Sequence, residues 1–233
     1  MATVAINQEA ERTITFYRSA VGKKVVMAVT GFLLFGFIVM HLIGNLLIYL
    51  PKDSNGQWPI DVYAAQLHAI PELLWSARII LLVAVILHIV AAWQLSVLNK
   101  LEARKQGYVR WTPVASSYAS RTMVWSGPII LLYVIYHLLD LTFGAFNPGF
   151  EFGQVHRNIV ASFTRPPVAA FYIIANLCLA FHLYHGLWSM CQSVGIAHPR
   201  YTPVLKMASK VIAVAIGIGF CSIPLAVVSG LVR

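Results

Sequence analysis

Five apolar runs, each long enough to cross a lipid bilayer, constrain the fold of this chain more than any other feature of its sequence. The hydrocarbon core of a bilayer is about 30 Å thick, and an α-helix of about 20 residues spans it. Polar segments that contain proline, glycine, asparagine and basic residues separate the runs. The runs are 25–50, 73–98, 123–146, 168–191 and 207–232. The sequence therefore predicts an all-α membrane protein with five transmembrane helices, in one domain over residues 1–233.

The composition agrees with lipid as the solvent and argues against a soluble enzyme. Charged residues make up 11% of the chain and hydrophobic residues 59%, whereas about 25% of a soluble domain is charged. The three cysteines, Cys178, Cys191 and Cys221, lie in apolar stretches and form no CxxC or CxxCH motif. Covalent haem attachment and zinc-finger chemistry are therefore not expected. Residues 1–24 are polar, so a cleavable signal peptide is not expected either.

The distribution of positive charge predicts the orientation in the membrane. Most of the 17 Lys and Arg residues lie in the N-terminal arm and in the loops after the second and fourth runs. These are Arg12, Arg18, Lys23, Lys24, Lys100, Arg104, Lys105, Arg110, Arg121, Arg200, Lys206 and Lys210. The others are Lys52, Arg78, Arg157, Arg165 and Arg233. Because basic loops stay inside, the N-terminus is expected in the cytoplasm and the C-terminus outside. The net charge of +9 is then a topology signal, and no nucleic-acid partner is expected.

Histidines occur inside four of the five predicted spans, where ionisable side chains are costly and mark functional sites. At a rise of about 1.5 Å per residue, His41 and His137 both lie about 21 Å from the cytoplasmic ends of their helices. His88 and His182 lie about 21 to 22 Å from the outer ends of theirs. In a core of about 30 Å, His41 and His137 meet in the outer half, and His88 and His182 meet in the inner half.

Two stacked histidine pairs in a bundle of the first four spans are what two bis-histidine haems require. Imidazole is a common axial ligand of haem iron, and the burial around it tunes the potential. The alternative is that each histidine only donates a hydrogen bond to a neighbouring helix, but four histidines at two matched depths argue against it. His185 lies three residues after His182 and shares its helix face. Depth favours His182 as the iron ligand. His185 would then donate a hydrogen bond from behind the ligands or contact a haem propionate.

At these residues the chain resembles the cytochrome b membrane subunit of succinate dehydrogenases and fumarate reductases, in its five-helix, two-haem form. The matching stretches are 19–24, 41–45, 118–123, 137–140 and 182–189. The first reads Ser-Ala-Val-Gly-Lys-Lys, and the last reads His-Leu-Tyr-His-Gly-Leu-Trp-Ser. The resemblance implies that His41 and His137 bind a distal haem b and that His88 and His182 bind a proximal one. The family pattern also selects His182, four residues before Gly186.

The resemblance implies a function for the chain within a larger complex. It would be the di-haem anchor of succinate:quinone oxidoreductase, respiratory complex II of the tricarboxylic acid cycle, in a bacterial cytoplasmic membrane. It would pass electrons from an iron–sulfur subunit to a quinone, with menaquinone favoured over ubiquinone. A flavoprotein would be the other partner, and the whole complex could form a higher oligomer. The chain has no dehydrogenase active site of its own, so it would be an enzyme only as a subunit.

Three alternatives remain open at this point. The complex could run in the reverse direction, as a fumarate reductase. The chain could anchor another quinone-linked dehydrogenase, such as a hydrogenase or formate dehydrogenase. It could also be a transporter whose histidines relay protons or bind a metal ion.

Candidates for the quinone site lie on both sides of the membrane. Ser19, Lys23 and Arg121 are the inner candidates for contact with a quinone or a haem propionate. The outer loop 57–72 contains further polar candidates, Asp61, Tyr63, His68 and Glu72.

Two further positions bear on proton movement. Asp140 is the only acidic residue well inside a span, and it is either a proton relay or a helix-end residue that reaches interfacial water. At Ala180, some menaquinol-oxidising relatives of the family carry a proton-conducting glutamate, so that route is expected to be absent here.

Overall fold

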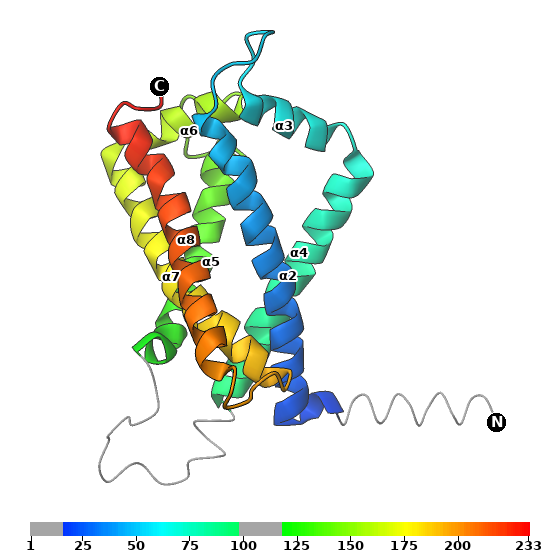
Figure 1. Cartoon of the computed structure of the whole chain (residues 1–233). Coiled ribbons are helices and arrows are strands. Elements are labelled where there is room, and N and C mark those ends of the chain that lie inside the picture. The colour runs from blue at the N-terminus through cyan, green and yellow to red at the C-terminus, as the bar shows by residue number, and fades with distance from the viewer. Residues whose placement is uncertain (1–15, 98–117) are drawn as a thin grey trace, which may run out of the picture.

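The fold of the protein is given by a computed structural model, which describes residues 16–97 and 118–233. All regular elements in this part of the chain are helical (Figure 1). Five helices are long: α2 (Ala20–Leu46), α4 (Pro71–Val97), α5 (Tyr118–Leu141), α7 (Pro166–Ser193) and α8 (Thr202–Val228). Three are short: η1 (Leu47–Tyr49), α3 (Pro59–His68) and α6 (Val155–Phe163). Each long helix has the length and apolarity to cross a membrane, which confirms the predicted all-α fold with five spans.

The long helices run alternately up and down between two ends of the molecule. α2 begins at one end, and α8 finishes at the other, beside α6 and at the same end as α3 (Figure 1). We call these the N-terminal end and the α3/α6 end. Because the number of long helices is odd, the start of α2 and the end of α8 lie at opposite ends of the bundle, in agreement with the orientation predicted from the charges.

The long helices differ from the predicted spans mainly where a turn interrupts an apolar run. The third run was expected to reach residue 146, but α5 ends at Leu141. Gly144 then adopts φ +71, and the ring of Phe150 fills the space that a Cβ on Gly144 would need. A positive φ costs glycine little, and it stops a right-handed helix. The loops predicted around 57–72 and 147–167 contain α3 and α6, which were not expected.

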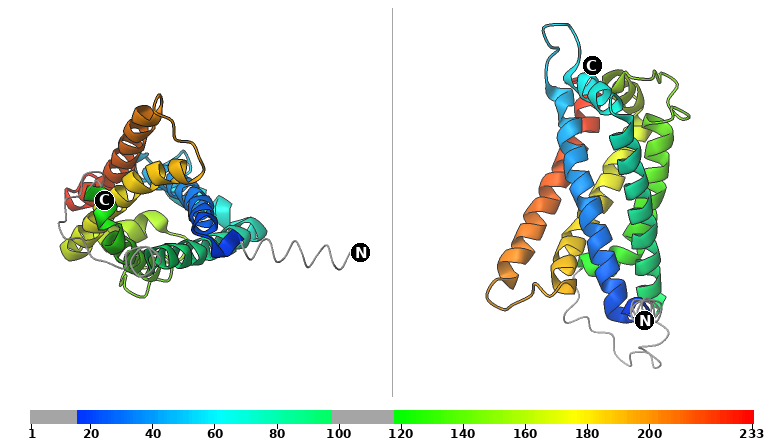
Figure 2. Two further views of the ribbon diagram at one scale, coloured as in Figure 1. Left: turned by 90° about the horizontal axis from the view of Figure 1, so that it is seen from below. Right: turned by 90° about the vertical axis from the view of Figure 1, so that its right-hand side faces the viewer.

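Four of the long helices surround the axis of the bundle, and the fifth lies outside them. α2 packs against α4 and α7, α5 packs against α7, and α8 packs against α7 and α2 (Figure 2). Small residues permit the closest approaches of α8. A Cβ on Gly219 would lie 2.9 Å from the side chain of Leu42 on α2. Small residues at such contacts are typical of helix packing in lipid.

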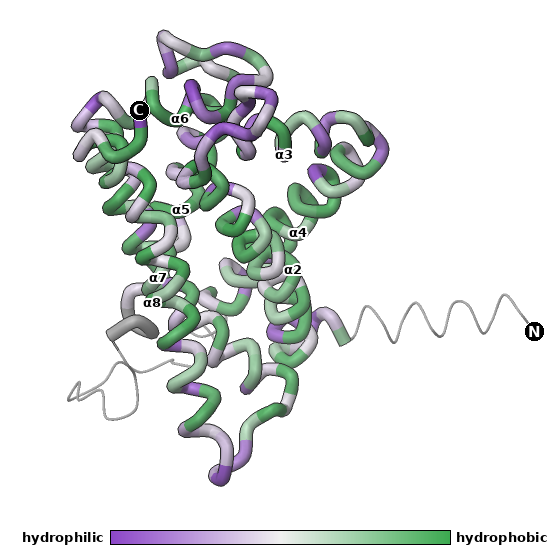
Figure 3. Tube along the Cα trace, turned by 45° about the horizontal axis from the view of Figure 1, so that its top comes forward, coloured by the Kyte–Doolittle hydropathy of each residue, from purple (hydrophilic) through white to green (hydrophobic). Residues whose placement is uncertain are grey.

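The outward faces of the long helices are apolar along most of their length (Figure 3). On α4, for example, Ile79, Leu82, Ile86 and Trp93 are all exposed. A continuous exposed apolar surface of this extent is unstable in water but favourable in a hydrocarbon environment. The chain is therefore a multi-pass membrane protein.

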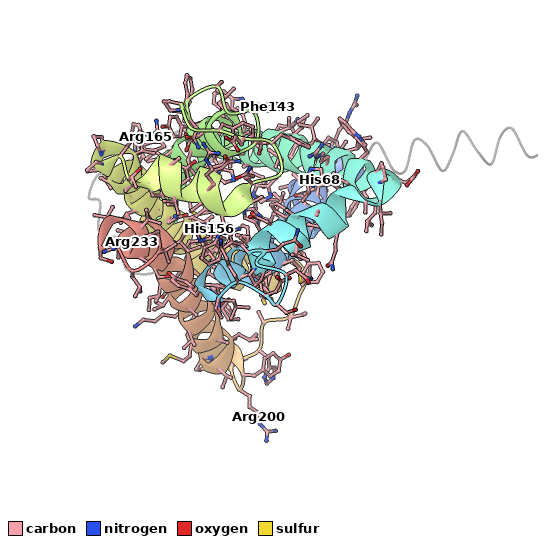
Figure 4. The ribbon with its side chains drawn as sticks, turned by 90° about the horizontal axis from the view of Figure 1, so that it is seen from above. His68, Phe143, His156, Arg165, Arg200 and Arg233 are labelled. Atoms are coloured by element: carbon pink, nitrogen blue, oxygen red, sulfur yellow. The ribbon has the colours of Figure 1, made fainter. Side chains whose placement is uncertain are left out.

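Helices α3 and α6 contact each other and cover the α3/α6 end of the bundle. The Trp58 ring, at the start of α3, stacks on the His156 ring of α6 with centroids 3.8 Å apart and an interplanar angle of 1°. The Lys52 ammonium lies 5.1 Å from the Trp58 ring. Asp61 Oδ1 accepts a hydrogen bond from the backbone N–H of His156 at 2.8 Å. Figure 4 looks onto this end and shows His156 near its middle and His68 towards its edge.

We expect this cover to lose stability in acid. Burial lowers the pKa of His156 below its ordinary 6.5, the Asp61 carboxylate raises it less, and Lys52 lowers it further. The unfolded state therefore binds the proton more readily, so the contribution of His156 is complete above pH 6.5 and is lost as the pH falls below it. The thermal midpoint of the protein in detergent should fall between pH 7.5 and pH 5.5, and less so in His156→Phe, which keeps the stack. An equal fall in His156→Phe and wild type would contradict this.

Candidate cofactor site

The structure brings the four span histidines together as two pairs. The rings of His41 on α2 and His137 on α5 have centroids 5.8 Å apart and an interplanar angle of 89°. The rings of His88 on α4 and His182 on α7 have centroids 6.5 Å apart and an interplanar angle of 59°. These are the two pairs predicted from depth in the membrane.

The two pairs lie at different heights in the bundle. His41 and His137 lie within the last two turns of α2 and α5, which finish at the α3/α6 end. His88 and His182 lie in the second halves of α4 and α7, which run towards the N-terminal end. Each pair joins two different helices, so the four helices around the bundle axis each contribute one ring.

The separations suit a metal held between two imidazoles. An imidazole nitrogen lies about 2 Å from a metal that it binds, so two rings facing each other across one metal ion have centroids about 6 Å apart. Within the described residues, no group of three or more His, Cys, Asp or Glu side chains converges as a metal-ion site. Two-histidine pairs without further protein ligands fit a haem, whose macrocycle supplies the other four ligands of the iron.

His137 gives a second indication that the site is built for a ligand. Its Nδ1 is buried and has no hydrogen-bond partner in the part of the chain that the structure describes. Leaving a buried polar atom unpaired costs about 1–3 kcal/mol. A group bound between His41 and His137 would give this ring a partner.

Two hydroxyl groups lie behind the other pair, and neither was among the residues predicted from the sequence. Thr30 Oγ1 on α2 is 3.1 Å from His88 Nδ1, and Ser126 Oγ on α5 is 3.1 Å from His182 Nδ1. Both hydroxyl residues are buried, and each is followed by a glycine. A Cβ on Gly31 would lie 3.4 Å from the His88 ring, so the backbone of α2 approaches that ring closely. In the sequence, a hydroxyl residue directly before a glycine within a predicted span is the signal that could have identified both residues.

The structure also distinguishes His182 from its neighbour His185. His182 faces His88, whereas the His185 ring makes no hydrogen bond or ring contact among the residues described. Ala180 lies against α8: a Cβ on Gly217 would be 2.9 Å from the Ala180 Cβ. A glutamate at position 180 would therefore meet α8, unless the helices moved apart.

The inner candidates for quinone contact are already engaged near the start of α2. Ser19 is the N-cap of α2, and its Oγ accepts the backbone N–H of Gly22 at 3.0 Å. Lys23 is buried, and its Nζ donates to the backbone carbonyl of Arg18 at 2.7 Å. The side chain of Arg121 lies outside the described residues. A role for these three residues in quinone or propionate contact stays a prediction.

The outer candidates have separate neighbours. Asp61 binds the backbone of α6, as described above. Tyr63 packs against Gly44 of α2, where a Cβ would lie 2.7 Å from the tyrosine ring, so only glycine fits beneath it. His68 is exposed, and its Nδ1 lies 2.8 Å from a carbonyl of its own helix. Glu72 is exposed in the first turn of α4.

Asp140 is fully buried and is the centre of a polar network that joins α5, α6 and α7. Its carboxylate accepts hydrogen bonds from Ser162 Oγ at 2.5 Å, Tyr172 Oη at 3.0 Å and an Arg165 guanidinium nitrogen at 2.9 Å. The exposed fraction of Asp140 is 0%, so of the two alternatives left open by the sequence, the helix-end residue that reaches interfacial water does not hold. The Tyr172 ring is 6.0 Å from the His137 ring, so the network borders the outer histidine pair. Arg165, at the start of α7, lies towards the edge of this end (Figure 4).

Comparison with known proteins gave one match. The sequence profile of the family described as succinate dehydrogenase/fumarate reductase transmembrane subunit matches residues 99–219, which is more than half of the chain. Neither curated proteins nor solved structures gave a match. The matched region contains His137 and His182, one histidine of each pair.

Proposed function

Because the chain belongs to the family of succinate dehydrogenase/fumarate reductase transmembrane subunits, we propose that it is the di-haem cytochrome b anchor of a succinate:quinone oxidoreductase. The membrane location and the role as an anchor subunit follow from the family and the five apolar helices. The haem proposal depends mainly on one observation, the two histidine pairs with ring centroids 5.8 Å and 6.5 Å apart. An anchor subunit that only holds a complex in the membrane would not require two facing histidine pairs.

Each pair has its own place in the proposed function. His88 and His182 would hold the proximal haem b, near the N-terminal end, and His41 and His137 would hold the distal haem b, near the α3/α6 end. When bound, haem supplies the one-electron exchange that the side chains of this chain do not. The chain orients the ligand rings, excludes water from them with apolar helices, and leaves glycine backbone such as Gly31 close to one ring.

The N-terminal end is the proposed docking side for the flavoprotein and iron–sulfur subunits. Exposed basic residues gather there: Arg18, Lys24, Arg200, Lys206 and Lys210. The same positive charge supports a cytoplasmic position for this end in a bacterial membrane. Anionic lipid headgroups would contact it as well.

The quinone, with menaquinone favoured, is proposed to bind at the α3/α6 end. At the N-terminal end, Ser19 and Lys23 already bond to backbone atoms. At the α3/α6 end, His68 and Glu72 are exposed and carry polar groups that can reach a ligand. A site there would also give the His41/His137 pair a purpose, because it lies at that end.

Purification of the whole complex tests the proposal. We expect the chain to copurify with a flavoprotein and an iron–sulfur subunit, to reduce quinone with succinate, and to yield two non-covalent b haems per chain by pyridine haemochrome analysis. A single haem would show that one histidine pair has been misassigned. No Soret absorbance at all would favour the transporter alternative and contradict the haem proposal.

A further inference from the structure

We propose that Thr30 and Ser126 are positioning residues for the proximal haem. In this proposal they hold the His88 and His182 rings with Nδ1 protonated and Nε2 free for iron, and thereby lower the reduction potential of that haem alone. The proposal rests on the proposed function, since it needs a haem between these two rings.

The hydrogen bonds of Thr30 determine which nitrogen of His88 carries the proton. The Thr30 hydroxyl has one proton to donate, and it donates to the carbonyl of Val26 at 2.7 Å, with Met27 at 3.2 Å as a second acceptor. Towards His88 Nδ1, 3.1 Å away, the oxygen can then only accept. His88 must donate from Nδ1, so in the neutral ring the free lone pair lies on Nε2.

Ser126 occupies the equivalent place on the opposite side of the pair, with a longer bond to its own helix, and the proposal gives its hydroxyl the same role as acceptor from the ring Nδ1. Its hydroxyl lies 3.4 Å from the carbonyl of Met123 in its own helix and 3.1 Å from His182 Nδ1. Thr30 and Ser126 are both only 5% exposed, so water has little access to replace them. The order across the bundle is therefore hydroxyl, imidazole, imidazole, hydroxyl, with α2 and α4 on one side and α5 and α7 on the other.

The His41/His137 pair has no equivalent support. In the part of the chain that the structure describes, no side-chain hydroxyl is hydrogen-bonded to the His41 ring or to the His137 ring, in contrast to the Thr30 and Ser126 contacts of the other pair. Any effect of the two hydroxyls should therefore be confined to one haem. This selectivity separates a positioning role from a general effect on folding.

A hydrogen bond from the far nitrogen of a ligand imidazole orients the ring and makes it a stronger electron donor to the metal. A stronger donor stabilises the oxidised iron, so the reduction potential falls. Removing the acceptor should have the opposite effect. Loss of such a partner changes metal affinity or activity by about tenfold or more, and a tenfold change in a one-electron equilibrium is about 59 mV.

Redox titration of the intact complex tests the proposal, with Thr30→Val and Ser126→Ala as the variants. Each should make reduction of one haem about tenfold more favourable and leave the other haem unchanged. The affected haem should be the one that His88→Ala removes. Its low-spin EPR signal should also shift or broaden, because the rings lose a fixed orientation. Thr30→Ser keeps the hydroxyl and should behave as wild type.

Ser209→Ala is the matched control for Ser126→Ala. Ser209 is a buried serine on α8 whose hydroxyl donates to the carbonyl of Leu205 at 2.9 Å and touches no histidine. It should change neither potential. Two bound haems with unchanged potentials in Thr30→Val and Ser126→Ala would overturn this proposal alone. Equal shifts of both haems, or a shift of the haem that His41→Ala removes, would overturn it too. A wild-type complex without haem would overturn the proposed function and this inference together.

Discussion

We expect His88→Ala or His182→Ala to remove the proposed proximal haem while the distal haem stays bound, and His41→Ala or His137→Ala to do the reverse. This is the largest effect that we expect from any single substitution, because in the proposed function each iron would have only two protein ligands and the two pairs share none. The measurement is haem stoichiometry by pyridine haemochrome, with low-temperature spectra to show which haem is lost.

His185→Ala is the control for these variants. It removes an imidazole from the same helix face as His182, but His185 does not face His88. Both irons should remain six-coordinate and low-spin. If His185→Ala abolishes a low-spin signal while His182→Ala spares it, the ligand in α7 has been misassigned. Loss of both haems from every ligand variant would show that the bundle holds them as one unit, which contradicts two independent sites.

Asp140→Ala is expected to lower the free energy of unfolding by about 3 kcal/mol. Removal of one partner from a buried ion pair costs about 3–5 kcal/mol, because the other charge is left uncompensated. The lower end applies here, because the side chain of Arg165 is 32% exposed and water can partly solvate it. The hydroxyls of Ser162 and Tyr172 would also lose their acceptor. Reversible unfolding in mixed detergent, or the thermal midpoint, measures the change.

Glu151→Ala provides a comparison at the same end of the molecule. Glu151 pairs with Arg157, and both side chains are exposed, so the loss should be below about 1 kcal/mol. Asp140→Asn keeps hydrogen-bonding capacity and should destabilise less than Asp140→Ala. A stable Asp140→Asn protein that binds both haems but turns over quinone slowly would favour the proton-relay role. Full stability and full turnover in Asp140→Ala would contradict both roles.

Much of the architecture was predictable because lipid restricts what a membrane chain can do. A span must be apolar and about 20 residues long, so the five long helices were visible as five runs. Their alternating directions and regular rise then placed His41 with His137 and His88 with His182. The structure brings the same rings together, because a helix converts residue spacing into height in the bundle.

The short helices at the α3/α6 end were not predictable in the same way. α3 and α6 lie outside the apolar spans, so bilayer thickness does not constrain them. They are held by particular contacts between distant residues, such as Trp58 with His156. The partners of Asp140 come from two other helices, and its burial follows from how those helices meet. From the sequence alone, a helix end in interfacial water was as reasonable as a proton relay, and the buried network was not predicted.

Height in the membrane is a property of one helix, but the direction in which a side chain points depends on its neighbours. Depth therefore identified the histidines, whereas the hydroxyls behind them depend on the rotation of α2 against α4 and of α5 against α7. Thr30 and Ser126 are polar residues in apolar runs, and they become partners of His88 and His182 only when those helices pack. A hydrogen bond forms only when the donor–acceptor distance falls within a range of a few tenths of an ångström. Only the packed side chains of two helices can set such a distance.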